Sequence, residues 1–266
     1  MNAVRWLMGA WAWIALAGLA QAHTCVKTVR WFDDPPYTFR TSSGEIQGFY
    51  AELARVTLRQ MGCTPQFVEM PWARALLELE KGRLDILPGA LYKPQREAFA
   101  YFSQPINRSP NVLFMGQQAA DKYHITQLAD LIGTDFRLGA QIGVAYGSSF
   151  DALLNNPAFK ARVTFVTLRR SAWHMVSINR LDGLISDEVT GLMELQQLGL
   201  SQAIARTQLV VSGGPAMFAF SKKSNTPDVV QGFNTAFAAL LADGQYKHIA
   251  ERYLPCAVSV DKLGCI

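Results

Sequence analysis

Short apolar runs alternate with amphipathic segments in the first third of the chain, and this order constrains the fold more than any other feature. Apolar runs with the length of buried strands lie at residues 26–32, 66–70 and 84–87. Between them, residues 48–61 and 72–81 place apolar side chains at helical spacing, and a glycine stands where each helix would end. A strand–helix–strand–helix–strand order predicts an α/β fold with a parallel sheet and right-handed crossovers.

The remainder of the chain continues this alternation. Further strands are expected at residues 112–115, 136–140, 163–166, 184–185 and 216–220, and further helices at 127–131, after Ser148, at 171–180, between Thr226 and Asp243, and around 246–253. The triplet Arg-Leu-Asp occurs at residues 83–85 and again at 180–182, each time between a helix and a short strand. This repetition predicts two similar α/β units.

The loop after the strand at residues 84–87 is a candidate binding edge. Pro88, Gly89 and Pro94 predict that the strand ends in an irregular loop. In open α/β sheets, ligands bind beyond the carboxyl ends of the strands. Arg96 lies in this loop, and its planar guanidinium can hold a carboxylate through two hydrogen bonds. The alternative is an ordinary surface arginine, which is the commoner situation.

Composition and charge argue against several classes of protein. Half of the residues are hydrophobic and 17% are charged, which is typical of a globular chain. The formal charge of +4 is spread along the chain without a basic block, so nucleic-acid binding is not expected. No phosphate loop or nucleophile elbow occurs, and His23, His124, His174 and His248 lack ligand spacing. We therefore predict neither a cofactor nor a metal site.

The N-terminus has the pattern of a secretory signal peptide over residues 1–22. Arg5 supplies a positive charge, residues 6–19 are apolar, and Ala20-Gln21-Ala22 is a small-residue cleavage site. An uncleaved anchor is the alternative, but this apolar stretch is shorter than the ~20 residues of a spanning helix. We expect an exported, periplasmic protein whose mature chain starts near His23.

The even number of cysteines in an exported chain favours disulfides, and four cysteines allow three pairings. Cys25 precedes the first expected strand and Cys63 the second, so neighbouring parallel strands would bring them together. That pairing would leave Cys256 with Cys265. Four free buried thiols are the alternative, and they are less expected outside the cytosol.

An ordered set of short motifs covers nearly the whole mature chain. The motifs are Pro35-Pro36-Tyr37-Thr38-Phe39, Gly44-x-x-x-Gly48-Phe49 with Glu52-Leu53, Leu79-x-x-Gly82-Arg83-Leu84-Asp85, Arg96, Phe102-Ser103-x-Pro105, Gly139-Ala140-Gln141-x-Gly143, Arg180-x-Asp182 with Asp187, and Asp243-Gly244. In this order they resemble the periplasmic solute-binding proteins of amino-acid importers of the ABC type, extracellular family 3.

This resemblance implies a two-lobed clamshell of the type II periplasmic-binding-protein fold. Each lobe would be a mostly parallel sheet flanked by helices, and two hinge strands would connect the lobes. Lobe one would comprise residues 23–110 and 216–266, and lobe two residues 111–215. The ligand would bind between the lobes and favour a closed form.

The resemblance also implies site residues. Arg96 matches the arginine that holds a ligand carboxylate, with the backbone of Gly89 and Leu91 beside it, and Asp187 matches the acid that takes an ammonium group. Further ligand contacts are implied at Trp72, Asp34, Tyr37 and Tyr146. Asp187 could instead only cap a helix, and Trp72 could belong to the core. Arg74 could pair with Glu78 four residues on, or offer a second grip on an anion.

The departures from the family pattern bear on the ligand more than on the fold. Polar-amino-acid binders of this family have hydroxyls two and four residues after the position of Gly89, where this chain has Leu91 and Lys93. Tyr50 replaces the acid that usually follows Gly-Phe. The resemblance still implies capture of a small carboxylate-bearing solute, such as an amino acid, by a monomer that serves a membrane permease. There are two alternatives: an enzyme on the same fold, such as a cyclohexadienyl dehydratase, and a sensory ligand-binding module.

Overall fold

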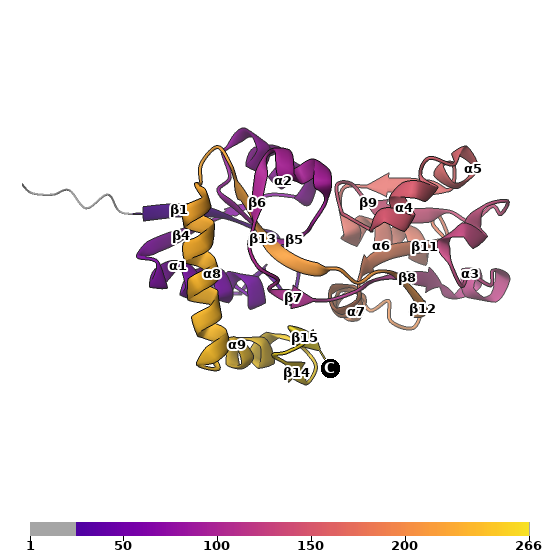
Figure 1. The fold of residues 1–266 in the computed structure, drawn as a ribbon. Helices are drawn as coiled ribbons and strands as arrows, with labels where there is room; N and C mark the ends of the chain where they lie inside the picture. The colour runs from indigo at the N-terminus through magenta and orange to yellow at the C-terminus, as the bar shows by residue number, and fades with distance from the viewer. Residues whose placement is uncertain (1–24, 266) are drawn as a thin grey trace, which may run out of the picture.

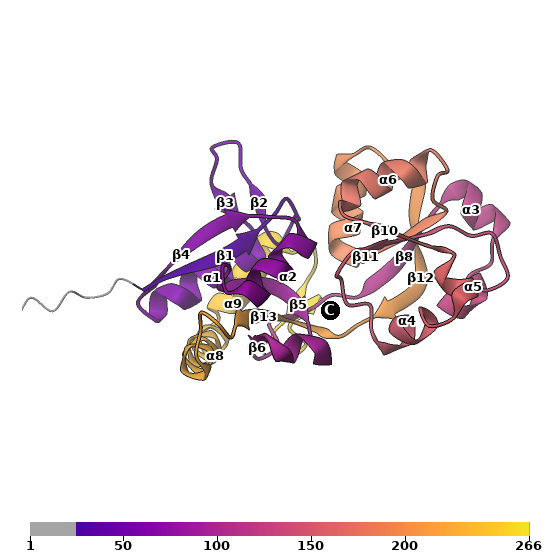
Figure 2. The ribbon, with the colours of Figure 1, turned by 90° about the horizontal axis from the view of Figure 1, so that it is seen from above.

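The computed structural model describes residues 25–265, and these residues form two α/β lobes side by side (Figures 1 and 2). The expected signal peptide, residues 1–22, lies outside the described residues. Within residues 25–265, no helix combines the length and apolarity needed to cross a membrane. The clamshell fold expected from the sequence is confirmed.

Lobe one is built on a sheet with the order β14-β15-β7-β13-β5-β1-β4, and β6 also pairs with β13. Its strands are β1 (Cys25–Trp31), β4 (Cys63–Glu69), β5 (Ile86–Leu91), β6 (Ala100–Phe102), β7 (Asn107–Arg108), β13 (Pro215–Ser221), β14 (Val258–Ser259) and β15 (Gly264–Cys265). As predicted, β1 lies parallel to both β4 and β5. A separate hairpin of β2 (Phe39–Arg40) and β3 (Ile46–Gln47) stands beside this sheet (Figure 2).

The helices of lobe one cover this sheet. They are α1 (Phe49–Gln60), α2 (Trp72–Lys81), α8 (Pro227–Ala242), α9 (Gln245–Tyr253) and the 3-10 helix η1 (Pro94–Ala98). One core cluster joins Phe49 and Leu53 of α1 to Phe233 and Phe237 of α8, all fully buried. The amphipathic faces that the sequence predicts are thus buried against the sheet and against each other.

Lobe two contains a five-stranded sheet with the order β10-β9-β11-β8-β12. Its strands are β8 (Asn111–Gly116), β9 (Leu138–Gln141), β10 (Val163–Val166), β11 (Gly183–Asp187) and β12 (Ile204–Ser212). Its helices are α3 (Gln117–Lys122), η2 (Leu128–Leu131), α4 (Ser148–Leu153), α5 (Pro157–Lys160), α6 (Arg169–Ser177) and α7 (Glu188–Gln197). Strands β9, β10 and β11 are parallel, whereas β8 is antiparallel to β11 and β12.

The expectation of a mostly parallel sheet in each lobe is wrong: both sheets are mixed, because the chain passes twice from one lobe to the other. It leaves lobe one between β7 and β8, at Ser109-Pro110, and returns between β12 and β13, at Gly213-Gly214 (Figure 1). Of the strands on either side of these crossings, β8 runs antiparallel to β11 and β12, and β13 runs antiparallel to β5 and β7. The sequence did not predict β12, which forms the edge of the second sheet.

The expected irregular loop at Pro88-Gly89 is instead part of β5, so that expectation is wrong. The pairing of β5 with β13 shifts register there, because Ala90 faces Met217 whereas Leu87 faces Ala219. This bulge accommodates a proline, which has no N–H for the ladder. Gly89 has φ +77°, and a Cβ at this position would lie 2.7 Å from the ring of Tyr50, so a glycine is required.

Both predicted cysteine pairings are present in the structure. Cys25 and Cys63 face each other across the β1–β4 ladder and form a disulfide, with their Cα atoms 4.5 Å apart. Cys256 and Cys265 join the chain before β14 to β15, with Cα atoms 5.5 Å apart. No cysteine of the described chain is left free.

Candidate ligand-binding site between the lobes

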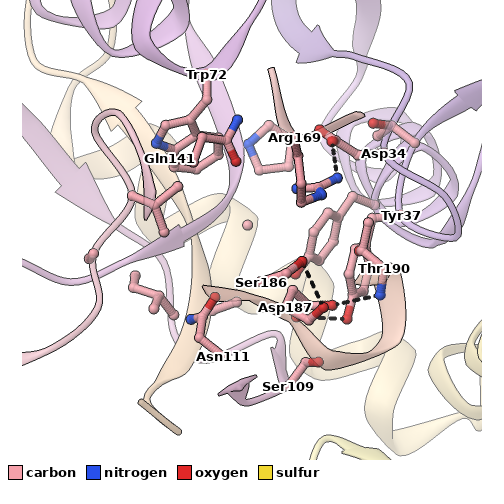
Figure 3. Close-up of a pocket in the computed structure, with 18 of the residues that line it drawn as sticks. Asp34, Tyr37, Trp72, Ser109, Asn111, Gln141, Arg169, Ser186, Asp187 and Thr190 are labelled. Carbon is pink, nitrogen blue, oxygen red and sulfur yellow. Dashed lines mark hydrogen bonds and ion pairs between the residues drawn. The ribbon is translucent and has the colours of Figure 1, made fainter. Parts of the chain in front are cut away.

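A cavity of about 120 Å³ lies between the two lobes and is lined by side chains from both (Figure 3). Lobe one contributes Arg30 at the end of β1, Asp34 and Tyr37 from the loop after β1, and Trp72 at the start of α2. Lobe two contributes Gln141, Tyr146, Arg169 and Asp187, which lie at or just beyond the ends of strands. The site thus forms where the carboxyl ends of parallel strands meet, as is usual in α/β sheets.

Asp187 is an acidic group that faces this cavity from lobe two. It ends β11 and caps α7, and its Oδ1 accepts the Thr190 N–H at 3.0 Å. Its Oδ2 accepts the Tyr37 hydroxyl at 3.5 Å across the gap between the lobes. In the part of the chain that the structure describes, no lysine, arginine or histidine forms an ion pair with it. Burial raises the pKa of Asp187, because low polarity disfavours the charged form.

Aromatic rings form the lobe-one side of the cavity next to Asp187. The rings of Tyr37 and Tyr50 stack with centroids 4.6 Å apart, and the Tyr50 hydroxyl donates to Asn107 Oδ1 at 2.6 Å. Burial raises the pKa of both tyrosines well above its usual range, so both stay neutral. Ser109, from the first crossing, places a buried hydroxyl in the same cavity, next to Tyr37 and Asp187.

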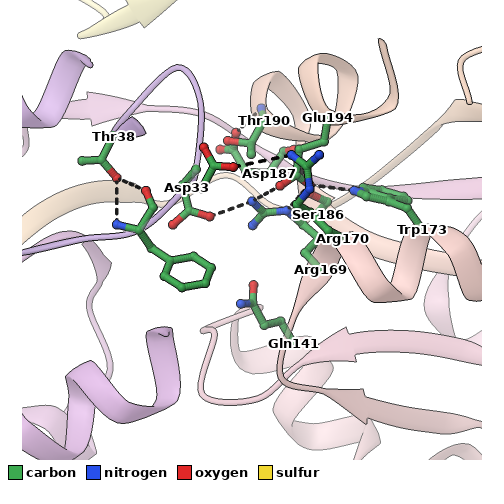
Figure 4. Close-up of polar contacts among 12 residues, drawn as sticks. Asp33, Thr38, Gln141, Arg169, Arg170, Trp173, Ser186, Asp187, Thr190 and Glu194 are labelled. Carbon is green, nitrogen blue, oxygen red and sulfur yellow. Dashed lines mark hydrogen bonds and ion pairs between the residues drawn. The ribbon is translucent and has the colours of Figure 1, made fainter. Parts of the chain in front are cut away.

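A buried ion network of Arg30, Asp34, Arg169 and Glu194 forms another wall of the site. Arg30 Nη1 lies 2.8 Å from Asp34 Oδ2, and Arg169 of lobe two reaches Asp34 Oδ1 at 2.8 Å. Arg169 also lies 2.7 Å from Glu194 Oε2, and Figure 4 shows these two residues next to Trp173. The Trp173 indole also donates to Glu194, at 2.7 Å. Burial acts to raise the pKa of Asp34, but the two arginines outweigh it and lower that pKa. The two positive and two negative charges balance within the network.

Arg96 lies elsewhere than the resemblance implies. It is buried in η1 and donates one hydrogen bond to the Leu91 carbonyl and another, of 2.6 Å, across to the Gly143 carbonyl of lobe two. Its side chain lines a second inter-lobe cavity, of about 390 Å³, and not the one that contains Asp187. The structure does not bring Arg96 and Asp187 together in one cavity, and the carboxylate contact of Arg96 stays a prediction.

The other predicted site residues fall into two groups. Arg74 is 60% exposed, pairs with Glu78 at 2.7 Å, and lines neither cavity. Trp72 lines the first cavity and donates to the Gly143 carbonyl at 3.1 Å. The remaining predicted residues that line the same cavity are Asp34, Tyr37, Gly89, Leu91, Tyr146 and Asp187.

Sequence reasoning missed several residues of the site. Gln141 lies in one of the family motifs but was not assigned to the site. The other residues line the cavity and match no motif, namely Arg30, Ser109, Asn111, Arg169 and Thr190. Arg30 lies at the end of β1 and Arg169 follows β10. Their position at the carboxyl ends of parallel strands was the one signal in the sequence that could have assigned them to the site. Among residues 25–265, no group of histidine, cysteine or acidic side chains is placed to hold a metal ion.

Two α/β lobes with a cavity between them define a ligand-binding clamshell. The chain belongs to the bacterial extracellular solute-binding proteins, family 3, because the sequence profile of that family matches residues 31–255. Among its relatives is the ABC transporter arginine-binding protein 1 of Escherichia coli K12, with 22% identity over 83% of this chain and 87% of that protein.

Two solved structures show the same fold. A histidine kinase sensor domain with similarity to periplasmic binding proteins has a TM-score of 0.75 and 20% identity, over 88% of this chain and 96% of that one. An ancestral arginine-binding protein bound to arginine has a TM-score of 0.74 and 20% identity, over 86% of this chain and 98% of that one.

Proposed function

We propose that this protein is the periplasmic binding component of an ABC importer. It captures a small solute that carries an amine and a carboxylate, such as an amino acid, and presents it to a membrane permease. The observation that carries the proposal is Asp187, a carboxylate in the inter-lobe cavity that has no cationic partner among the described residues. A bound ammonium group would compensate this charge. The arginine-binding relative supports the same class of solute.

Several contacts across the gap support capture by lobe closure. Tyr37 reaches Asp187, Arg169 reaches Asp34, and Lys93 pairs with Asp151 at 3.0 Å. Each pair joins one residue of lobe one to one of lobe two. A solute that bridges the lobes in the same way would favour the closed form, and a permease could recognise that form.

A thermal-shift screen of the purified protein tests the solute class. Amino acids, polyamines, dicarboxylates and small peptides are compared, because a ligand that binds only the folded state raises the melting temperature. We expect compounds with both an amine and a carboxylate to stabilise the protein, and Asp187→Asn to abolish this shift. Asp33→Asn, which removes a more exposed acid outside the cavity, is the matched control and should keep the shift. Stabilisation by dicarboxylates alone would contradict the proposal.

Uptake and product formation separate the importer from its alternatives. Deleting the gene should abolish cellular uptake of the identified solute, whereas unchanged uptake would favour a sensory module. An enzyme would need a general acid in the cavity, and Asp187 is the candidate for that role. The other acid in the cavity, Asp34, is held ionised by two arginines, so it has no proton to donate. We expect no turnover, and product formation from prephenate or arogenate would overturn this expectation.

A further inference from the structure

Among residues 25–265, two buried charges of opposite sign form no ion pair, and they face different cavities. Asp187 lines the first cavity, and Arg96, which is only 6% exposed, lines the second. The hydrogen-bond acceptors of Arg96 are neutral carbonyl oxygens of Leu91 and Gly143. Burial lowers the pKa of Arg96 to about 10, which still leaves it charged at neutral pH. Each of these groups would gain from an opposite charge on a ligand.

The other charged groups that line the second cavity do not compensate the buried charge of Arg96. Lys93 and Asp151 also line this cavity, and they neutralise each other across the gap between the lobes, 3.0 Å apart. Glu80 is exposed to solvent at the rim. Solvent screens a charge in that position, so it compensates a buried guanidinium weakly.

The two cavities are neighbours separated by a contact between the lobes. Gln141, Val144 and Tyr146 line both of them. Between the cavities, the Gly143 carbonyl of lobe two accepts hydrogen bonds from Arg96 at 2.6 Å and from Trp72 at 3.1 Å, both from lobe one. These two hydrogen bonds need the lobes to be close together. A separation of the lobes would break both hydrogen bonds.

We propose that the ligand is a zwitterion whose ammonium and carboxylate groups lie at opposite ends of a chain. The ammonium pairs with Asp187 in the first cavity, and the carboxylate pairs with Arg96 in the second, in place of the Gly143 carbonyl. This inference rests on the proposed function and names its ligand class, that of ω-amino acids. An α-amino acid carries both charges on one carbon, so it would leave one of the two buried groups uncompensated.

Isothermal titration calorimetry with pairs of isomers tests the spacing of the charges. The pairs are 4-aminobutanoate with L-2-aminobutanoate, and 6-aminohexanoate with L-norleucine, so that only the position of the amine differs within a pair. We expect the ω-isomer to bind about tenfold tighter or more in at least one pair. Equal or tighter binding of the α-isomer in both pairs would overturn the inference.

Single-charge probes test the assignment of each end. Hexylamine should bind the wild type and the Arg96→Gln variant alike, and lose affinity in Asp187→Asn. Hexanoate should show the reverse pattern. A loss of both probes in the same variant would contradict two separate ends, and circular dichroism checks that both variants are folded. If α-isomers bind more tightly and their binding depends on Asp187, the ω-amino-acid inference is wrong but the proposed function stands. If no amine-bearing acid binds, both the inference and the proposed function are wrong.

Discussion

The ion network and Asp187 lie on the walls of the same cavity, but they differ in how their charges are compensated. In the network, Asp34 has an arginine on each side at 2.8 Å, and Arg169 lies 2.7 Å from Glu194. Asp187 has one backbone N–H and one tyrosine hydroxyl. A neutralised network gains little from a charged ligand, whereas an uncompensated carboxylate gains much. The network joins the two lobes through Arg169 and Asp34, and the difference supports our proposal that Asp187 binds the ligand.

The largest expected effect is loss of stability when the network is broken. Arg169→Met leaves Glu194, with its side chain 1% exposed, with the Trp173 indole but no cation. Removing one partner of a buried ion pair typically costs about 3–5 kcal/mol. Urea unfolding followed by circular dichroism should therefore show a clear drop in the free energy of unfolding. A change below about 1 kcal/mol would show that the network does not stabilise the fold.

Asp187→Asn should raise the free energy of unfolding of the ligand-free protein, whereas Arg169→Met should lower it. Asparagine keeps the cap on α7, because its side-chain oxygen can still accept the Thr190 N–H. The pKa of Asp187 is higher in the folded state than in the unfolded state. An unfolded aspartate titrates at about 4, so above this pH the folded protein becomes less stable, until the pH passes the raised pKa of the folded state. At neutral pH the variant should be more stable by roughly 1 kcal/mol, the scale of a typical substitution.

The pH dependence sharpens this comparison. The stability difference between Asp187→Asn and the wild type should shrink as the pH falls below the raised pKa of Asp187 and vanish below about 4, because the wild-type carboxyl is then neutral in both states. Ligand affinity of the wild type should fall over the same range. Urea unfolding at several pH values measures the first effect. A difference that is independent of pH would assign it to packing and not to charge.

The smallest expected effect is that of Arg170→Met, which is the matched control for Arg169→Met. Arg170 is the next residue in α6 and also reaches lobe one, but its contact with Asp33 is 3.6 Å long and both side chains are about half exposed. Exposed ion pairs contribute about 0–1 kcal/mol because solvent and salt screen them. The same urea titration should show little change. A loss as large as that of Arg169→Met would mean that burial does not distinguish the two pairs.

The sequence predicted much of the fold, because helical periodicity and short apolar runs are local signals. The strand at residues 163–166 is observed as β10 with the same bounds, and the predicted helix at 72–81 is α2. The edge strand β12 was missed, and so was the continuation of β5 through Pro88-Gly89. The bulge that admits Pro88 depends on β13, which lies more than a hundred residues further along the chain.

The candidate site was predicted in part for the same reason. The resemblance implied Asp34, Tyr37, Trp72 and Asp187, and the structure places all four around one cavity. The resemblance implied that Arg96 and Asp187 bind the same ligand, but the direction of the Arg96 side chain depends on two carbonyl oxygens, and one of them belongs to the other lobe. A motif gives the position of a residue in the chain and not the acceptors around it.

By itself, the sequence determined the alternation of strands and helices, the family, and the places in the chain where polar residues leave the strands. Only the tertiary structure decided which charges are paired. Asp34 and Arg169 are 135 positions apart, and they meet because two lobes close against each other. The physical reason is that the energy of a charge depends on its surroundings in three dimensions, and those surroundings come from distant segments of the chain.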